Sequence, residues 1–190
     1  MTPTAQTRRT TARPIADGRR PAPDVAAMIR VDQAGEYGAT RIYAGQLAVM
    51  GDRIAAATLI AGMAAQEAEH RARFDALLAE RGIRPTLLQP FWNVAGFALG
   101  AATALIGPEA AMACTAAVET EIDRHYADQL VELGDAEPEL AETIARFQAE
   151  EMEHHDTAML HGAERAPAYA LLSGVIRLGC RVAIAVSKRI

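Results

Sequence analysis

The chain has 190 residues, of which 51% are hydrophobic and 5% aromatic, and its formal net charge is −5 at pH 7. This length suits one domain with a sizeable core, and the acidic balance argues against nucleic acid as a partner. The two cysteines, Cys114 and Cys180, are far apart and form no Cys-x-x-Cys motif. This argues against a disulfide framework and excludes a sulfur-ligated zinc or iron site.

The first 23 residues differ from the rest because they are rich in Thr, Arg and Pro, with Asp17 as their single acid. They contain no apolar stretch of the kind that secretory signals carry. We interpret residues 1–23 as a disordered leader or as an organellar transit peptide. The folded domain is then expected over residues 24–190.

The domain is expected to be helical, because it is rich in Ala and in apolar residues at helical spacing. The first helix should begin after the N-cap residue Asp24 and run to about residue 50, where Gly51 and Asp52 form a turn. The second should end before Gly82. Two small residues on the inner face of the first helix would let a neighbouring helix approach closely: Gly35 and Gly38.

Residues 85–108 contain no charged side chain, and their number approaches that of a membrane span. Pro90 and several polar and glycine residues lower the apolarity, however, and the segment lies where a ferritin-like bundle has its long crossover. Three interpretations stay open: a buried helix packed on the bundle, a helix lying in a membrane surface, and the lining of a tunnel for an apolar substrate.

Two further helices are expected, one over about residues 108–133 and one from about 137 until Gly162 interrupts it. The last helix should span residues 168–188, with basic residues on one side and apolar residues over most of the rest. Such a helix can lie in a membrane interface, form a subunit contact or cap the core. Its basic residues are Arg177, Arg181 and Lys188.

The most informative pattern is a lone glutamate followed in the next helix by Glu-x-x-His, and it occurs twice. Residues three apart lie on the same side of a helix, so each Glu-x-x-His can hold one metal ion, which the lone glutamates would complete or bridge. This is the ligand set of a carboxylate-bridged two-metal centre in a four-helix bundle. The six candidate ligands are Glu36, Glu67, His70, Glu119, Glu151 and His154.

The charge of this set supports the interpretation. Four carboxylates buried together would be costly without metal, whereas two divalent cations would cancel their charge. Oxygen and imidazole ligands suit iron or manganese. We therefore expect an all-α fold, a ferritin-like four-helix bundle with a carboxylate-bridged diiron centre and two additional apolar or amphipathic helices.

Two acids lie one turn from the lone glutamates, Asp32 before Glu36 and Asp123 after Glu119. Metal-bound imidazoles usually donate their second N–H to a carboxylate, so these acids are candidate partners of the histidines. The alternative is that both are exposed helix acids. Tyr126, two turns beyond Glu119, lies on the same helix face and can reach the metal pocket.

Several longer stretches resemble one known family, the demethoxyubiquinone hydroxylases of ubiquinone biosynthesis. Among them are RVDQAGEYGATRIYAGQ (30–46), QPFWNVAGFALGAATALIG (89–107) and EEMEHHD (150–156). The resemblance implies a diiron enzyme that hydroxylates the ring of a polyprenylated demethoxyubiquinone with O2, taking electrons from NADH. It places the iron ligands on the six residues above and gives His125 and Tyr126 an assisting role in electron or proton transfer.

The resemblance also implies where such a protein works. We expect peripheral attachment to the cytoplasmic face of a bacterial inner membrane, or to the matrix side of the mitochondrial inner membrane if the leader is a transit peptide. A homo-oligomer and a lipid-binding partner protein are further expectations. The alternatives are a ferritin-like ferroxidase that stores iron and a rubrerythrin-like peroxidase. Strongly apolar segments suit a storage cage poorly, and the Cys-x-x-Cys module of rubrerythrins is missing.

Overall fold

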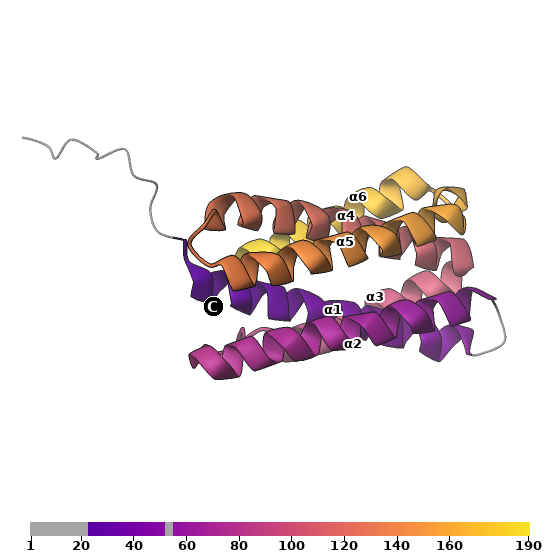
Figure 1. The fold of residues 1–190 in the computed structure, drawn as a ribbon. Helices are drawn as coiled ribbons and strands as arrows, with labels where there is room; N and C mark the ends of the chain where they lie inside the picture. The colour runs from indigo at the N-terminus through magenta and orange to yellow at the C-terminus, as the bar shows by residue number, and fades with distance from the viewer. Residues whose placement is uncertain (1–22, 52–54) are drawn as a thin grey trace, which may run out of the picture.

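The computed structural model describes residues 23–51 and 55–190, and these are almost entirely helical, with no strand among them (Figure 1). The predicted leader, apart from residue 23, and Asp52 of the predicted turn lie outside the described residues. The helices are α1 Val25–Met50, α2 Ala55–Arg81, α3 Gln89–Ile106, α4 Pro108–Leu133, α5 Pro138–Leu160 and α6 Tyr169–Ser187, with a short 3-10 helix, η1 Ala163–Arg165, before the last. The prediction of an all-α fold is confirmed.

The helix ends follow local sequence signals. The side chain of Asp24 accepts a hydrogen bond of 3.0 Å from the backbone N–H of Ala27 and so caps α1. Gly82 and Gly134 follow α2 and α4 with φ values of 62° and 50°, a conformation that glycine adopts without strain. The expected boundaries of these helices are thereby confirmed.

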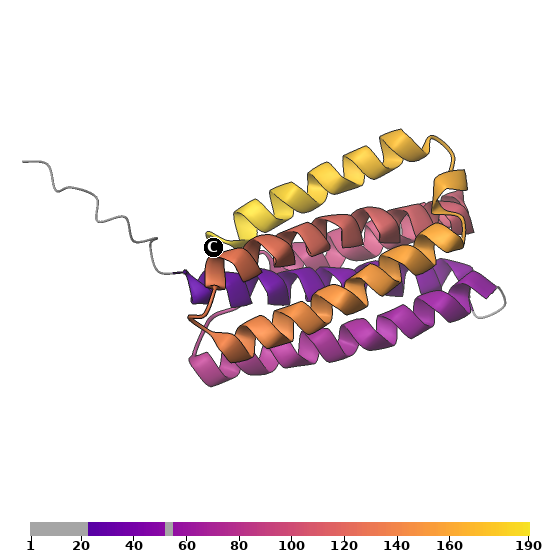
Figure 2. The ribbon, with the colours of Figure 1, turned by 45° about the horizontal axis from the view of Figure 1, so that its top comes forward.

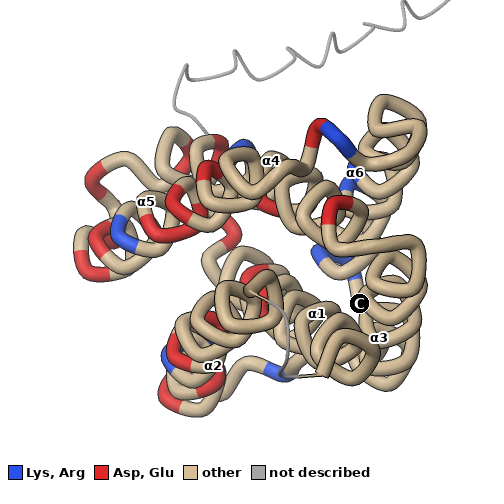
Figure 3. The backbone as a smooth tube through the Cα atoms, turned by 90° about the vertical axis from the view of Figure 1, so that its right-hand side faces the viewer, with Lys and Arg blue, Asp and Glu red and all other residues tan. Residues whose placement is uncertain are grey.

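Four of the helices form the bundle, and the other two lie against its outside. Helix α1 pairs with α2, and α4 pairs with α5. Helix α3, in the crossover between the two pairs, packs along α1, and α6 packs along α4 (Figure 2). The view along the bundle shows α3 and α6 together on one side and α2 and α5 on the other (Figure 3). This is the predicted bundle with two additional helices.

Helices α1 and α3 approach each other so closely that their backbones touch. A Cβ atom added to Gly100 would lie 1.9 Å from the carbonyl oxygen of Ile42, and one added to Gly45 would also meet the α3 backbone. The prediction that Gly35 and Gly38 allow this approach was wrong, because a Cβ atom at either would meet nothing within 4 Å. Both glycines border a cavity instead.

The bundle core is apolar at both ends and polar in the middle. One apolar cluster gathers around Tyr43, Ile60 and Met63, and the other around Phe74 and Phe147. Along α2, α4 and α5 the candidate ligands lie between the residues that these two clusters contribute. The candidate site therefore has an apolar cluster at each end.

Candidate metal centre

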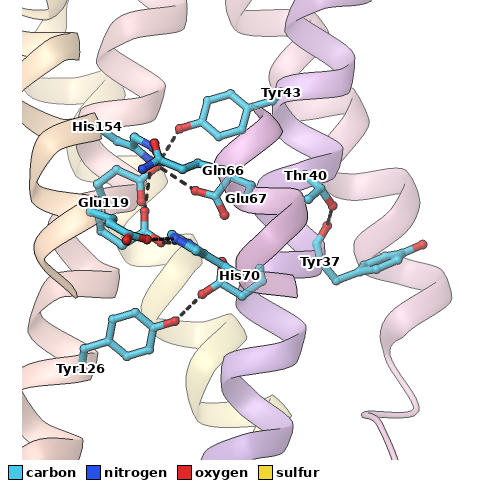
Figure 4. A network of polar contacts seen from close by, with 12 residues as sticks. Tyr37, Thr40, Tyr43, Gln66, Glu67, His70, Glu119, Tyr126 and His154 are labelled. Carbon is cyan, nitrogen blue, oxygen red and sulfur yellow. Dashed lines mark hydrogen bonds and ion pairs between the residues drawn. The ribbon is translucent and has the colours of Figure 1, made fainter. Parts of the chain in front are cut away.

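All six candidate ligands are buried inside the bundle. Figure 4 shows four of them close together: Glu67, His70, Glu119 and His154. The six candidate ligands form two overlapping groups, and within each group one ligand atom per residue lies within 4.8 Å of all the others. The first group is Glu36, Glu67, His70 and Glu151, and the second is Glu67, Glu119, Glu151 and His154. This arrangement offers two neighbouring metal positions.

The glutamates of the two Glu-x-x-His motifs, Glu67 and Glu151, belong to both groups. Glu151 lies between the histidines, with Oε1 3.0 Å from Nδ1 of His70 and Oε2 3.2 Å from Nδ1 of His154. Each lone glutamate belongs to one group only. Of the two roles left open for Glu36 and Glu119, the geometry favours completing one metal position each, with the motif glutamates as the bridges.

The carboxylates of this cluster are poorly satisfied by the protein itself. Both oxygens of Glu67 and one oxygen each of Glu36 and Glu119 are buried without a hydrogen-bond donor. Such groups are costly unless a cation or a donor meets them. The nearest groups are two imidazole nitrogens: Nδ1 of His154 lies 3.3 Å from Oε1 of Glu67, and Nδ1 of His70 lies 3.7 Å from Oε2 of Glu36. Two imidazoles do not balance four buried carboxylates, so the donor set fits two metal ions.

The electrostatics of the cluster lead to the same conclusion. Burial raises the pKa of Glu67 and of Glu119 well above the ordinary value, and the charge of Glu151 raises both further. Burial alone would lower the pKa of His70, but its contacts with Glu151 and Glu36 raise that pKa to about 10. The metal-free cluster therefore holds protons where bound cations would replace them.

We expect Mn(II) to raise the Tm of the metal-free protein, and to do so more at pH 7.5 than at pH 5.5. A carboxyl group whose pKa is raised in the folded state stabilises at low pH, and that stability is lost as pH rises through the raised pKa. Metal displaces these protons, so its affinity rises with pH. At a free concentration of a hundred times its Kd, the metal adds about 2.7 kcal/mol to the free energy of unfolding, which raises the Tm by roughly 5–10 °C. Equal Tm shifts at both pH values, measured by calorimetry, would contradict this prediction.

The outer nitrogen of each histidine contacts the residue that precedes the motif glutamate of the facing helix. Nε2 of His70 lies 2.5 Å from Oε2 of Glu150, and Nε2 of His154 lies 2.9 Å from Oε1 of Gln66. These contacts leave Nδ1 of both rings facing the cluster, where it can bind metal. Sequence reasoning missed both residues, although their shared place before the motif glutamate was a readable signal.

The prediction that Asp32 and Asp123 are the partners of these histidines was wrong. Asp123 accepts a hydrogen bond of 2.7 Å from Gln148. Asp32 is buried, so it is not an exposed acid either, and its Oδ1 lies 2.7 Å from Nε2 of Gln129. Both acids lie a full turn from the lone glutamates, outside the reach of the ligand histidines across the bundle.

A tyrosine hydroxyl supports each lone glutamate from the other helix pair. Tyr43 of α1 donates to Oε1 of Glu119 at 2.9 Å, and Tyr126 of α4 donates to Oε1 of Glu36. Burial raises the pKa of both hydroxyls well above the ordinary value, so both are protonated donors at neutral pH. Tyr126 reaches the pocket as expected, whereas sequence reasoning gave Tyr43 no role beyond the inner face of its helix.

His125 lies beside Tyr126 but does not touch the six candidate ligands. The two ring centroids are 6.2 Å apart, and Nε2 of His125 lies 3.1 Å from Oδ1 of the buried Asp32. Gln129 contacts both His125 and Asp32. Tyr126 and His125 thus lie between Glu36 and the polar side chains of Asp32 and Gln129. The assisting role of the pair stays a prediction.

An apolar cavity of about 360 Å³ lies between α1, α3, α4 and α6. Its walls include Gly35, Gly38, Trp92, Leu99, Ile176 and Gly179. Ala39, Ile42 and Val118 line both this cavity and a narrower void that Tyr43 and Glu119 also border. Ala39, Ile42 and Val118 therefore stand between the cavity and the Glu119 side of the cluster, and α3 forms one wall of the cavity.

Comparison with known proteins places the chain among enzymes. Residues 23–187 match the family described as ubiquinone biosynthesis protein COQ7. A 3-demethoxyubiquinol 3-hydroxylase of Rhodospirillum rubrum is 55% identical over 183 residues, which cover 94% of this chain and 86% of the relative. The NADPH-dependent 3-demethoxyubiquinone 3-hydroxylase, mitochondrial, of Bos taurus is 53% identical over 167 residues, 86% of this chain and 76% of the relative. The 5-demethoxyubiquinone hydroxylase, mitochondrial, of Saccharomyces cerevisiae is 44% identical over 179 residues, which cover 86% of this chain and 77% of the relative.

Proposed function

Because the chain belongs to the ubiquinone biosynthesis protein COQ7 family, we propose that it is a monooxygenase that hydroxylates the ring of a polyprenylated demethoxyubiquinol with O2 at a diiron centre. The observation that carries the proposal is the pair of ligand groups that share Glu67 and Glu151, beside an apolar cavity. A storage ferroxidase or a peroxidase is not favoured, because the similar curated proteins are named as hydroxylases.

The ligand set suits iron because its donors are carboxylate oxygens and imidazole nitrogens. Bound iron would supply the electrons that activate O2, which does not attack a ring C–H by itself. The protein holds the ligands for this chemistry: Tyr43 and Tyr126 fix Glu119 and Glu36, and the apolar ends of the bundle exclude water. The electron donor is a reduced nicotinamide nucleotide, NADH by the resemblance and NADPH by the names of the mitochondrial relatives.

The apolar cavity is the binding site we propose for the substrate. A volume of about 360 Å³ falls within the usual range of small-molecule sites, and a wall without charged side chains suits a quinol ring with a hydrocarbon tail. To reach the Glu119 side of the centre, the ring would have to displace Ala39, Ile42 and Val118, which separate the cavity from it. The tail would leave between α3 and α6.

Helices α3 and α6 form the face that we propose lies on the membrane. Among the described helices, only α6 is long and apolar enough to cross a membrane, by length and composition alone. Arg177 and Arg181 of α6, however, lie 2.7 and 3.5 Å from the buried carboxylate of Glu121 on α4. These ion pairs hold α6 along α4, so the helix would lie in the membrane surface instead of crossing the membrane. Large apolar side chains exposed on these helices are Phe91, Val94, Phe97, Leu105, Ile106, Leu171, Val175, Leu178, Val182 and Val186.

The distribution of charge supports this orientation. Acidic residues cluster on α5, on the side away from α3 and α6, whereas α2 carries both acidic and basic residues (Figure 3). An anionic bilayer would repel that side and attract the arginines of α6. We therefore propose a peripheral protein of the inner membrane, on the cytoplasmic face in a bacterium or the matrix face in a mitochondrion. The homo-oligomer and the lipid-binding partner protein remain predictions.

The function is tested with Fe(II)-loaded protein, NADH or NADPH, 18O2 and a polyprenylated demethoxyubiquinol in anionic liposomes. We expect one 18O atom in the hydroxylated ring by mass spectrometry, and the protein should sediment with the liposomes. Metal-free protein is the control. Rapid oxidation of iron without labelled product would contradict the hydroxylase and favour a ferroxidase, and protein left in the supernatant would contradict the membrane attachment alone.

A further inference from the structure

The metal centre is built from two copies of one arrangement. In each helix pair a tyrosine two turns beyond the lone glutamate crosses to the lone glutamate of the other pair. The residue before each motif glutamate likewise crosses to the motif histidine of the other pair. An exact repeat would make the surroundings of the two metal positions equal.

The repeat is broken at one chemically important place. Behind His70 stands the carboxylate of Glu150, with an Oε2–Nε2 distance of 2.5 Å, whereas behind His154 stands the neutral amide oxygen of Gln66 at 2.9 Å. Both imidazoles are buried, 1% and 3% exposed, while their acceptors lie at the edge of the bundle, the Glu150 side chain being 26% exposed. A carboxylate acceptor makes an imidazole a stronger metal ligand than an amide acceptor does.

We propose that Glu150 and Gln66 are positioning residues that make the two iron positions unequal. His70 is the stronger donor and His154 the weaker, and the weaker one shares its group with Glu119, the ligand on the cavity side. The substrate would thus approach the position with the less strongly bound iron. This inference rests on the proposed diiron centre and adds which of its two halves faces the substrate.

The rings of the two histidines also have different aromatic neighbours. His70 stacks on Phe147 with centroids 4.1 Å apart, whereas His154 meets the ring of Tyr43 edge-on at 6.5 Å. These contacts stay in place when only the outer hydrogen-bond partners are exchanged. Variants at Glu150 and Gln66 therefore separate the effect of the acceptors from that of the aromatic rings.

The test is Mössbauer spectroscopy of protein loaded with 57Fe(II), which needs no substrate. We expect two doublets from the unchanged protein and convergence of the two in Glu150→Gln, because both histidines then face an amide. Iron affinity in that variant should fall about tenfold. The double exchange Gln66→Glu with Glu150→Gln should restore two doublets. Glu153→Gln, the same change at an exposed site on α5, is the matched control and should leave the spectrum unchanged.

Each outcome decides the question. A spectrum of Glu150→Gln like that of the unchanged protein, with a change only in Glu150→Ala, would show that His70 needs any acceptor, and the proposal would be overturned. If Glu150→Gln does not fold, Gln66→Glu alone must also make the doublets converge. Failure of the unchanged protein to bind iron would instead sink the proposed function, before any variant is compared.

Discussion

Replacing Glu151 with Ala is expected to lower the hydroxylation rate at least about a thousand-fold while leaving the helical bundle folded. Glu151 is common to both ligand groups and contacts both histidines, so its loss disturbs both metal positions at once. Metal ions supply several kcal/mol of transition-state stabilisation, and each 1.36 kcal/mol is a factor of ten in rate. Product formation by mass spectrometry, bound iron and far-UV circular dichroism should be measured together.

The matched control is Glu153→Ala, which removes the same charge from the exposed side of α5. It should keep the rate within about twofold, as surface substitutions usually do. A folded Glu151→Ala protein that binds two irons and retains turnover within tenfold would rule out Glu151 as a shared ligand. The helical signal should persist, because removing one of four clustered carboxylates also removes repulsion from the core.

Replacing Gly100 with Ala is expected to destabilise the protein by about 3 kcal/mol or more, the upper range for overpacking. The added methyl would lie 1.9 Å from the carbonyl oxygen of Ile42 and 3.0 Å from its Cα. A backbone carbonyl cannot rotate away as a side chain can, so α3 must move off α1. Urea unfolding of the iron-loaded protein gives the measurement, and the apolar cavity should lose its α3 wall.

Gly62→Ala provides the comparison for this variant. Gly62 is also inside a helix, but it is exposed on α2 and a Cβ atom there meets nothing within 4 Å. Alanine is a better helix former than glycine by up to about 1 kcal/mol, so Gly62→Ala should stabilise. If the two substitutions changed the free energy of unfolding alike, the close packing of α1 on α3 would not hold in solution.

The sequence predicted those features that depend on spacing within one helix. Asp24, Gly82 and Gly134 mark helix ends through their own backbone preferences, and these ends are confirmed. The Glu-x-x-His spacing depends only on helical periodicity, so it allowed the prediction of the ligand set that the structure brings together. Neither result required knowledge of how the helices pack.

The features that could not be predicted depend on how the helices are aligned with one another in the bundle. Asp32 and Asp123 were chosen as histidine partners by their distance along one helix, but the contacts cross the bundle and fall on Gln66 and Glu150. In the same way, which glycines touch a neighbour is decided by where α3 crosses α1. From the sequence, the cavity could be predicted only as a tunnel of unknown position, because its walls come from four different helices.

The crossed hydrogen bonds make the candidate metal centre an interface between two helical hairpins. Each hairpin brings one lone glutamate, one Glu-x-x-His and one tyrosine, yet the tyrosine serves the opposite hairpin. A hairpin released from its neighbour would therefore have to meet a second hairpin, as subunits meet across a two-fold axis, to rebuild the site. Docking of the two hairpins, rather than formation of either one, is the step that brings all six candidate ligands together.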